Sequence, residues 1–198
     1  MIKNLIFDFG KVLVDYDFDV FFNGYIADEQ RREAFKPLFY NVEMQELFDR
    51  EATPIEEIAE GVRQRYPHFE HEIHLFIEHY HEMVTGEIEG MYALLKQLKQ
   101  EGYKLYGLTN WCSRVYKTIE QFPIFSLLDG WVISSEEKSI KPEPAIYNRL
   151  YEKFGLNPAE CLFADDKAVN IEGGRHTGMD GIVFENAQQY EQELRKRL

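Results

Sequence analysis

The sequence has few cysteines and no long hydrophobic run, and each absence excludes a class of protein. Only Cys112 and Cys161 occur among 198 residues, in different segments and without metal-type spacing. We therefore expect two buried free thiols in a reducing compartment. No run of eighteen apolar residues is present, so no transmembrane helix is expected. Asp8 interrupts the N-terminal apolar run too early for a signal peptide, and we expect a cytoplasmic protein.

Basic residues are also scarce. The chain has 22 lysines and arginines against 35 acidic residues, a net charge of −13. A negative net charge disfavours binding to nucleic acids and to anionic membrane surfaces, because both partners are themselves negatively charged. With 44% hydrophobic residues the chain can form a real core, so wholesale disorder is excluded. An anionic small molecule would have to be held by local cations or by a metal, and the oligomeric state stays open.

Short apolar runs alternate with helical patterns along most of the chain. Runs that are apolar on both faces are typical of strands buried in a parallel sheet. They lie at 4–7, 104–108, 131–133, 161–164 and 181–184. Helices are predicted between and after them at 88–98, 145–154, 169–176 and 187–198, with Gly102 as a C-cap glycine after the first. The alternation predicts an α/β fold with a Rossmann-like parallel sheet.

A segment of about 70 residues, from 15 to 85, breaks this alternation. It contains no convincing strand, and it has helical runs at 56–65 and 72–83. We interpret it as a helical cap domain inserted between strand 1 and strand 2 of the sheet. The α/β core would then comprise residues 1–14 and 86–198.

Polar and charged residues follow the predicted strands. Ligands of open parallel sheets bind beyond the carboxyl ends of the strands. The first strand ends at Asp8, the second at Thr109 and Asn110, and the fourth at Asp165 and Asp166. Lys141 follows the third strand. Three acids, one lysine and two neutral hydrogen-bonding residues should therefore converge on one edge, a set that packing alone does not require.

These residues, in this order, resemble the motifs of the haloacid dehalogenase superfamily. The motifs are Asp8-Phe9-Gly10-Lys11-Val12-Leu13, Leu108-Thr109-Asn110, Lys141-Pro142, and Asp165-Asp166 with Asn170. They span nearly the whole chain, and they look closest to small phosphatases with a helical cap inserted after the first strand. The resemblance implies a magnesium-dependent phosphatase acting on a small phosphorylated metabolite.

The resemblance also implies individual roles. Asp8 would be the nucleophile that forms an aspartyl-phosphate, which splits one hard step into two. Asp8, Asp166 and the backbone carbonyl of Gly10 would bind Mg²⁺, an ion that prefers oxygen ligands. Asp165 and Asn170 would act in the outer coordination sphere or through water.

The same resemblance assigns the phosphate contacts. Thr109 and the backbone amide of Asn110 would bind phosphate oxygens at a strand-to-helix turn. The ammonium group of Lys141 would neutralise the transferring phosphoryl group.

One position departs from the family pattern. Phosphatases of this family usually carry an aspartate two residues after the nucleophile, and that acid protonates the leaving group and then activates water. Here the residue is Gly10. Three explanations are open: a substrate with a good leaving group such as glucose 1-phosphate, another proton donor such as Asp15, Asp17 or a cap residue, or weak catalysis. Candidates for contacts that choose the substrate include Trp111, Phe18 and Phe48.

Two other functions compatible with Gly10 stay open. A metal-free 2-haloacid dehalogenase would also use Asp8 as its nucleophile, but it would leave the Asp165-Asp166 pair without a purpose. A non-catalytic protein that binds a phosphorylated ligand would not need the missing acid. A phosphomutase fits less well, because reorientation of the substrate normally relies on that acid.

Overall fold

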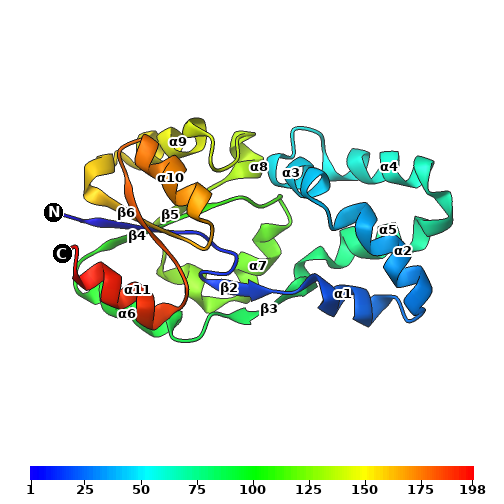
Figure 1. The fold of residues 1–198 in the computed structure, drawn as a ribbon, viewed down its shortest axis with the longest axis horizontal. Coiled ribbons are helices and arrows are strands. Elements are labelled where there is room, and N and C mark those ends of the chain that lie inside the picture. Colours follow the sequence, from blue (N-terminus) through cyan, green and yellow to red (C-terminus); the bar gives the residue numbers. More distant parts are fainter.

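The computed structural model describes residues 1–198, and its centre is a five-stranded sheet (Figure 1). The strand order is β5-β4-β1-β6-β7, and every neighbouring pair is parallel. The strands are β1 (Asn4–Phe7), β4 (Lys104–Thr109), β5 (Gly130–Ile133), β6 (Cys161–Asp165) and β7 (Asp180–Val183). The predicted α/β fold with a parallel sheet is therefore confirmed, with each strand end within one residue of its predicted position.

Helices cover both faces of the sheet, which explains why its strands are apolar throughout. In Figure 1, α9 and α10 lie above the sheet, and α6 and α11 lie below it. Along β1, Leu5 and Phe7 join one hydrophobic cluster while Ile6 joins a second on the opposite face. The helices of this part are α6 (Met91–Gln100), α7 (Val115–Gln121), α8 (Ser134–Glu137), α9 (Pro144–Phe154), α10 (Ala168–His176) and α11 (Ala187–Arg195).

A second group of helices forms a separate lobe at the other end of the long axis (Figure 1). We refer to residues 18–83 as the cap. Its elements are α1 (Phe18–Tyr25), α2 (Glu29–Phe39), α3 (Val42–Arg50), α4 (Ile55–Arg65) and α5 (Glu70–His79), with short 3-10 helices at Pro67–Phe69 and Tyr80–Met83. Phenylalanines fill its interior. The ring of Phe76 packs against those of Phe22, Phe39 and Phe48 from three other helices.

Two short strands connect the cap to the sheet, and the sequence analysis missed them. β2 (Val14–Tyr16) pairs antiparallel with β3 (Val84–Glu87). We predicted no strand between residues 15 and 85, and this is wrong at both ends of the segment. The strands have three and four residues, too few to show alternation, and their pairing joins residues far apart in the chain. They lie where the chain leaves the core and where it returns (Figure 1).

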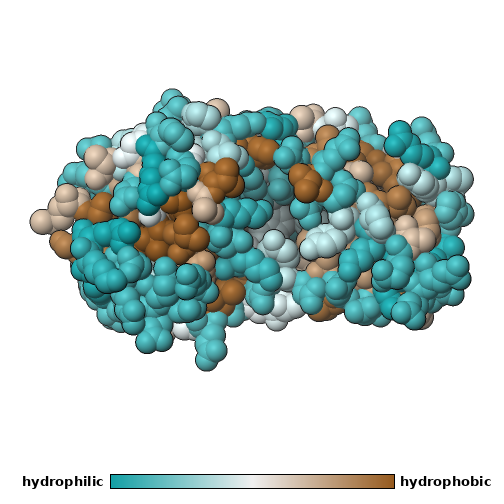
Figure 2. All heavy atoms as spheres, viewed as in Figure 1, coloured by the Kyte–Doolittle hydropathy of each residue, from teal (hydrophilic) through white to brown (hydrophobic).

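The surface is largely hydrophilic on the face shown in Figure 2, with scattered hydrophobic patches and a hollow between the two lobes. No helix combines the length and apolarity that a bilayer crossing would need. Both cysteines are buried free thiols, as predicted.

Candidate active site

The sequence-predicted residues converge at the carboxyl edge of the sheet. Asp8 directly follows β1, Thr109 ends β4 and Asp165 ends β6. Asp8 and Thr109 line a cleft whose opposite wall is formed by cap residues, whereas Asp165 lies behind it. The predicted residues that line it are Asp8, Gly10, Thr109, Asn110, Lys141, Asp166 and Asn170.

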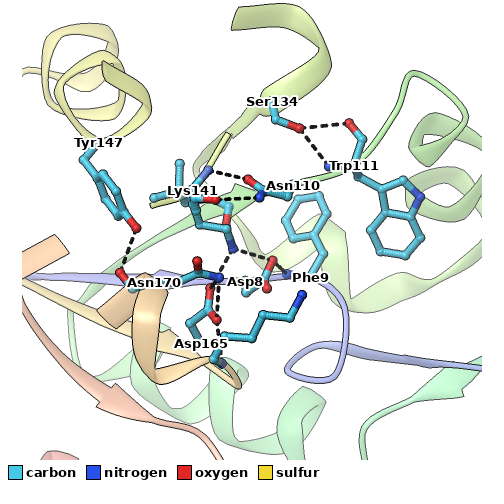
Figure 3. A network of polar contacts seen from close by, with 11 residues as sticks. Asp8, Phe9, Asn110, Trp111, Ser134, Lys141, Tyr147, Asp165 and Asn170 are labelled. Atoms are coloured by element: carbon cyan, nitrogen blue, oxygen red, sulfur yellow. Dashed lines mark hydrogen bonds and ion pairs between the residues drawn. The ribbon is translucent and has the colours of Figure 1, made fainter. Parts of the chain in front are cut away.

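Lys141 holds the centre of the site together (Figure 3). Its ammonium nitrogen lies 2.9 Å from Asp8 Oδ1 and 2.7 Å from Asp165 Oδ2, and it donates to the carbonyl of Leu108 at 2.9 Å. The side chain is completely buried. Burial alone would lower the pKa of Lys141, but the two carboxylates raise it, so the residue is a permanent cation at this edge.

Asn110 fixes the backbone of that lysine. The Asn110 side chain donates to the carbonyl of Lys141 at 3.0 Å and accepts from its backbone N–H at 2.7 Å. The side chain is therefore committed to positioning Lys141, and only the backbone amide of Asn110 is left for a ligand. The sequence analysis assigned this amide, and not the side chain, to the phosphate.

The adjacent acids Asp165 and Asp166 differ sharply in their surroundings. Asp165 is fully buried and accepts from Lys141, from the backbone of Lys167 and from the side-chain amide of Asn170. The Asp166 carboxylate makes no hydrogen bond or ion pair with another residue and lines the cleft. Asp165 is thus occupied as a structural anchor, whereas Asp166 is available to a ligand.

Asp8 has one occupied and one free oxygen. Oδ1 accepts from the backbone N–H of Phe9 at 2.7 Å and pairs with Lys141. Oδ2 has no such partner. The donors therefore fix the carboxylate while leaving one oxygen available at the cleft.

Thr109 carries an unsatisfied buried hydroxyl. Its Oγ1 has no hydrogen-bond partner although the residue is 1% exposed and lines the cleft. An unpaired buried hydroxyl costs about 1–3 kcal/mol, so such groups are usually paired with something. A phosphate oxygen in the cleft would satisfy it.

The acidic cluster fits a divalent metal ion. Carboxylate oxygens of Asp8, Asp165 and Asp166 all lie within 4.8 Å of one another. Burial raises the pKa of Asp8, with Lys141 opposing and the two other carboxylates adding to the rise. One lysine does not balance three carboxylates, and a cation bound to their oxygens would reduce the remaining repulsion. Hard oxygen donors suit Mg²⁺ in particular.

Tyr16 occupies the space next to Gly10. A Cβ atom on Gly10 would lie 2.8 Å from the Tyr16 ring, closer than real side-chain contacts, and 3.7 Å from Trp111. An aspartate would not fit here without displacing that ring. Asp15 and Asp17, two of our candidates for the missing acid, do not line the cleft. They line a separate groove, where Asp15 pairs with Lys11.

The cap contributes residues that sequence reasoning missed. Asp49 and Tyr80 of the cap line the same cleft as Asp8, as do Tyr16 of β2 and Lys167 between β6 and α10. Phe18 and Trp111 also line it, as we expected, but Phe48 lies outside it, in the apolar interior of the cap. In the sequence, Asp49 is one of many acids on the cap helices and carries no motif, so nothing distinguished it before the cap was seen against the core.

Comparison with known proteins agrees with this geometry. Residues 5–184 match the family model described as haloacid dehalogenase-like hydrolase. The D-ribitol-5-phosphate phosphatase of Bacteroides thetaiotaomicron is 26% identical, over 98% of this chain and 97% of that protein. Flavin mononucleotide hydrolase 1 of Arabidopsis thaliana is 30% identical, but the match covers 54% of this chain and 44% of that protein.

Solved structures share the fold. A wild-type enzyme from Bacteroides thetaiotaomicron, BT-2542, crystallised in complex with magnesium and inorganic phosphate, superposes with a TM-score of 0.74. It is 20% identical, with 94% of this chain and 96% of that chain covered. L-2-haloacid dehalogenase from Xanthobacter autotrophicus superposes with a TM-score of 0.68 at 16% identity, covering 100% of this chain and 84% of that chain.

Proposed function

The chain belongs to the haloacid dehalogenase-like hydrolases, and we propose that it is a magnesium-dependent phosphatase that forms an aspartyl-phosphate on Asp8. The free Oδ2 of Asp8, beside the buried ammonium group of Lys141, is the observation on which this proposal depends most. A carboxylate oxygen with no other partner can attack phosphorus, while the cation offsets the charge of the incoming phosphate.

Two free donors, together with the positive charge of Lys141, would hold the phosphate at the edge of the sheet. The Thr109 hydroxyl has no partner within the protein, and it would donate to a phosphate oxygen. The Asn110 amide and Lys141 lie beside it in the same cleft. Fixed donors at this position orient the phosphoryl group for in-line attack.

Asp8, Asp166 and the Gly10 carbonyl are the residues proposed to hold magnesium. When bound, the ion neutralises charge between the attacking carboxylate and the phosphate oxygens. Asp165 keeps Lys141 and Asn170 in place behind these residues, through contacts of 2.7 to 3.0 Å.

We further propose a small sugar or polyol phosphate as the substrate, glucose 1-phosphate among the candidates. The ribitol-5-phosphate phosphatase matches nearly the whole of this chain. The rings of Tyr16, Phe18 and Trp111 line the cleft, and such walls suit a small organic group.

The two alternative functions account for fewer features. A metal-free dehalogenase would use Asp8 and Lys141, but it would leave the carboxylate of Asp166 and the hydroxyl of Thr109 without partners. A non-catalytic binder would use Thr109 and Lys141, but it would not need the free Asp8 oxygen. Halide release without phosphate release, or tight phosphate binding without turnover, would favour these functions respectively.

The experiment is phosphate release from a panel of sugar and polyol phosphates with magnesium present. We expect wild-type turnover, and a loss of about 10³-fold or more in Asp8→Asn, because the amide is a far weaker nucleophile. Asp15→Asn is the matched control, since Asp15 lies outside the cleft. Full activity of Asp8→Asn would refute the covalent mechanism.

A further inference from the structure

We propose that Asp49 of the cap is the general acid and base of this phosphatase, in place of the acid that Gly10 lacks. This inference rests on the proposed function. It assigns a catalytic role to a cap residue that lines the same cleft as Asp8.

The end of α3 is bound to the core at Asp49 and at the two residues that follow it. Ser134 Oγ of α8 donates to the Asp49 carbonyl, and it also accepts from the backbone N–H of Trp111 at 2.9 Å. Figure 1 shows α3 at the edge of the cap that faces α8. The backbone of Asp49 is therefore tied to the loop that follows β4, and this loop carries the phosphate-binding residues.

The two residues after Asp49 add further ties. Arg50 makes a two-point ion pair with Glu143, with distances of 2.6 and 3.1 Å. Glu51 accepts from the backbone and hydroxyl of Ser113 at 2.7 and 2.9 Å. Catalytic groups have to be held in place by the surrounding structure, and these contacts supply that support.

The Asp49 carboxylate is not used by any of these contacts. It has no hydrogen-bond or ion-pair partner, although it is partly buried and lines the cleft with Asp8 and Asp166. A carboxylate with a purely structural role would normally be paired. Its free oxygens are available to a leaving group or to a water molecule.

The groups around Asp49 favour a carboxyl that exchanges its proton near neutral pH. Burial raises the pKa of Asp49 to about 7, Lys167 and Lys141 oppose the rise, and Glu46 adds to it. A general acid works best when its pKa lies near the working pH.

The phenols and the thiol beside Asp49 cannot replace it. Burial raises the pKa of Tyr16, Tyr80 and Cys112, so each keeps its proton. Lys141 also stays charged and is fully engaged with carboxylates. Asp8 and Asp166 are assigned to the metal ion. Asp49 is thus the remaining carboxyl in the cleft that is suited to donate a proton and accept it again.

The reaction then balances in two steps. Asp8 Oδ2 forms a bond to phosphorus as the bond from phosphorus to the leaving oxygen breaks. That oxygen keeps the electron pair and takes the Asp49 proton, which releases the alcohol. In the second step, the Asp49 carboxylate takes a proton from water as the water oxygen attacks phosphorus. The bond to Asp8 breaks, inorganic phosphate is formed, and both carboxyl groups return to their starting states.

The test compares leaving groups in Asp49→Asn. For alkyl phosphates such as glycerol 3-phosphate and ribitol 5-phosphate, we expect kcat/KM to fall about 10²–10⁴-fold, because an alkoxide leaves poorly without a proton. For p-nitrophenyl phosphate kcat/KM should change little, since p-nitrophenolate needs no proton to leave. Breakdown of the phospho-enzyme should become slow, so the variant should show a burst of p-nitrophenolate that the wild type lacks.

The outcomes separate the two proposals. Glu43→Gln, an equivalent change on an exposed acid of the same helix that does not act on the pKa of Asp49, should leave both substrates unaffected. If Asp49→Asn loses equal activity on both substrates, or none on either, Asp49 is not the proton donor, while phosphatase activity dependent on Asp8 still stands. If the wild type hydrolyses neither substrate class, the proposed function fails, and the role of Asp49 fails with it.

Discussion

Asp49 carries a cost in stability that depends on pH. Its pKa is raised by burial from 3.8 to about 7 in the folded protein. The folded state therefore binds this proton more tightly than the unfolded chain, and stability is lost as the pH rises from about 4 through about 7. Active-site groups are often destabilising in this way.

We expect Asp49→Asn to raise the free energy of unfolding at pH 8 by about 1–2 kcal/mol, because the amide avoids the buried charge and partial exposure limits the gain. The gain should disappear toward pH 4, where the folded carboxyl is protonated. Urea unfolding of the metal-free protein at both pH values measures it, with Glu43→Gln as the control. An equal gain at pH 4 and pH 8 would show that the charge of Asp49 is not its cause.

At the residue scale, the site divides into a part that sequence could place and a part that it could not. Asp8, Thr109 and Asp165 follow or end parallel strands, so strand topology alone brings them to one edge. Asp49 reaches the cleft only because the cap packs against the core. That packing joins segments distant in the chain, and no local pattern reports it.

At the scale of elements, the end of α3 is the contact through which cap and core meet at the cleft. Arg50 and Glu143 are 34% and 40% exposed, so solvent screens their attraction, and such pairs contribute about 0.2–1 kcal/mol. The Arg50–Glu143 pair is therefore a modest part of the contact, which Ser134 and Ser113 also hold through Asp49 and Glu51. A cap of this kind can exclude water during the reaction and release product afterwards.

We expect Arg50→Met to lower kcat/KM about 2–5-fold, since the loss of up to about 1 kcal/mol leaves the cap closed for less of the time. Faster amide hydrogen exchange in α3 should accompany the loss. Arg63→Met is the matched control, because Arg63 pairs with Glu60 within the single helix α4. Unchanged exchange in α3 with reduced kcat/KM would indicate that Arg50 acts on the substrate rather than on the cap.

Some of the helices and strands could be predicted from sequence patterns alone, and others could not. Gly102 has a φ of 96° and its N–H bonds to the Lys99 carbonyl just after α6, as its C-cap position predicts. The sheet strands were equally predictable, because burial on both faces makes them continuously apolar. β2 and β3 were not, since Thr85 and Gly86 interrupt the apolar pattern and the pairing partner lies about 70 residues away.

At the scale of the whole molecule, one hydrophobic cluster of 41 buried residues includes residues of both the cap and the sheet. The polar cleft lies between these two parts, lined from both sides. The molecule thus combines a shared apolar interior with a cleft where charges of both signs are concentrated. The net charge of −13 is compatible with an anionic substrate because Lys141, Lys167 and a bound cation would set the local potential.

The same net charge decides how magnesium binding has to be measured. Any added salt screens the repulsion between charges in a chain of net charge −13. Part of the stabilisation by MgCl₂ therefore needs no specific binding site. A specific site adds RT ln(1 + [Mg²⁺]/Kd), about 2.7 kcal/mol at 100 times Kd, or roughly 5–10 °C in Tm for a chain of this length. We expect calorimetry to show that the Tm of the wild type is higher by this amount in MgCl₂ than in NaCl at equal ionic strength. Asp166→Asn should lose most of it, because its carboxylate is the acid left free for the ion. An equal rise in Asp166→Asn, or in NaCl alone, would mean that magnesium acts on bulk charge and that the acidic cluster is not its site.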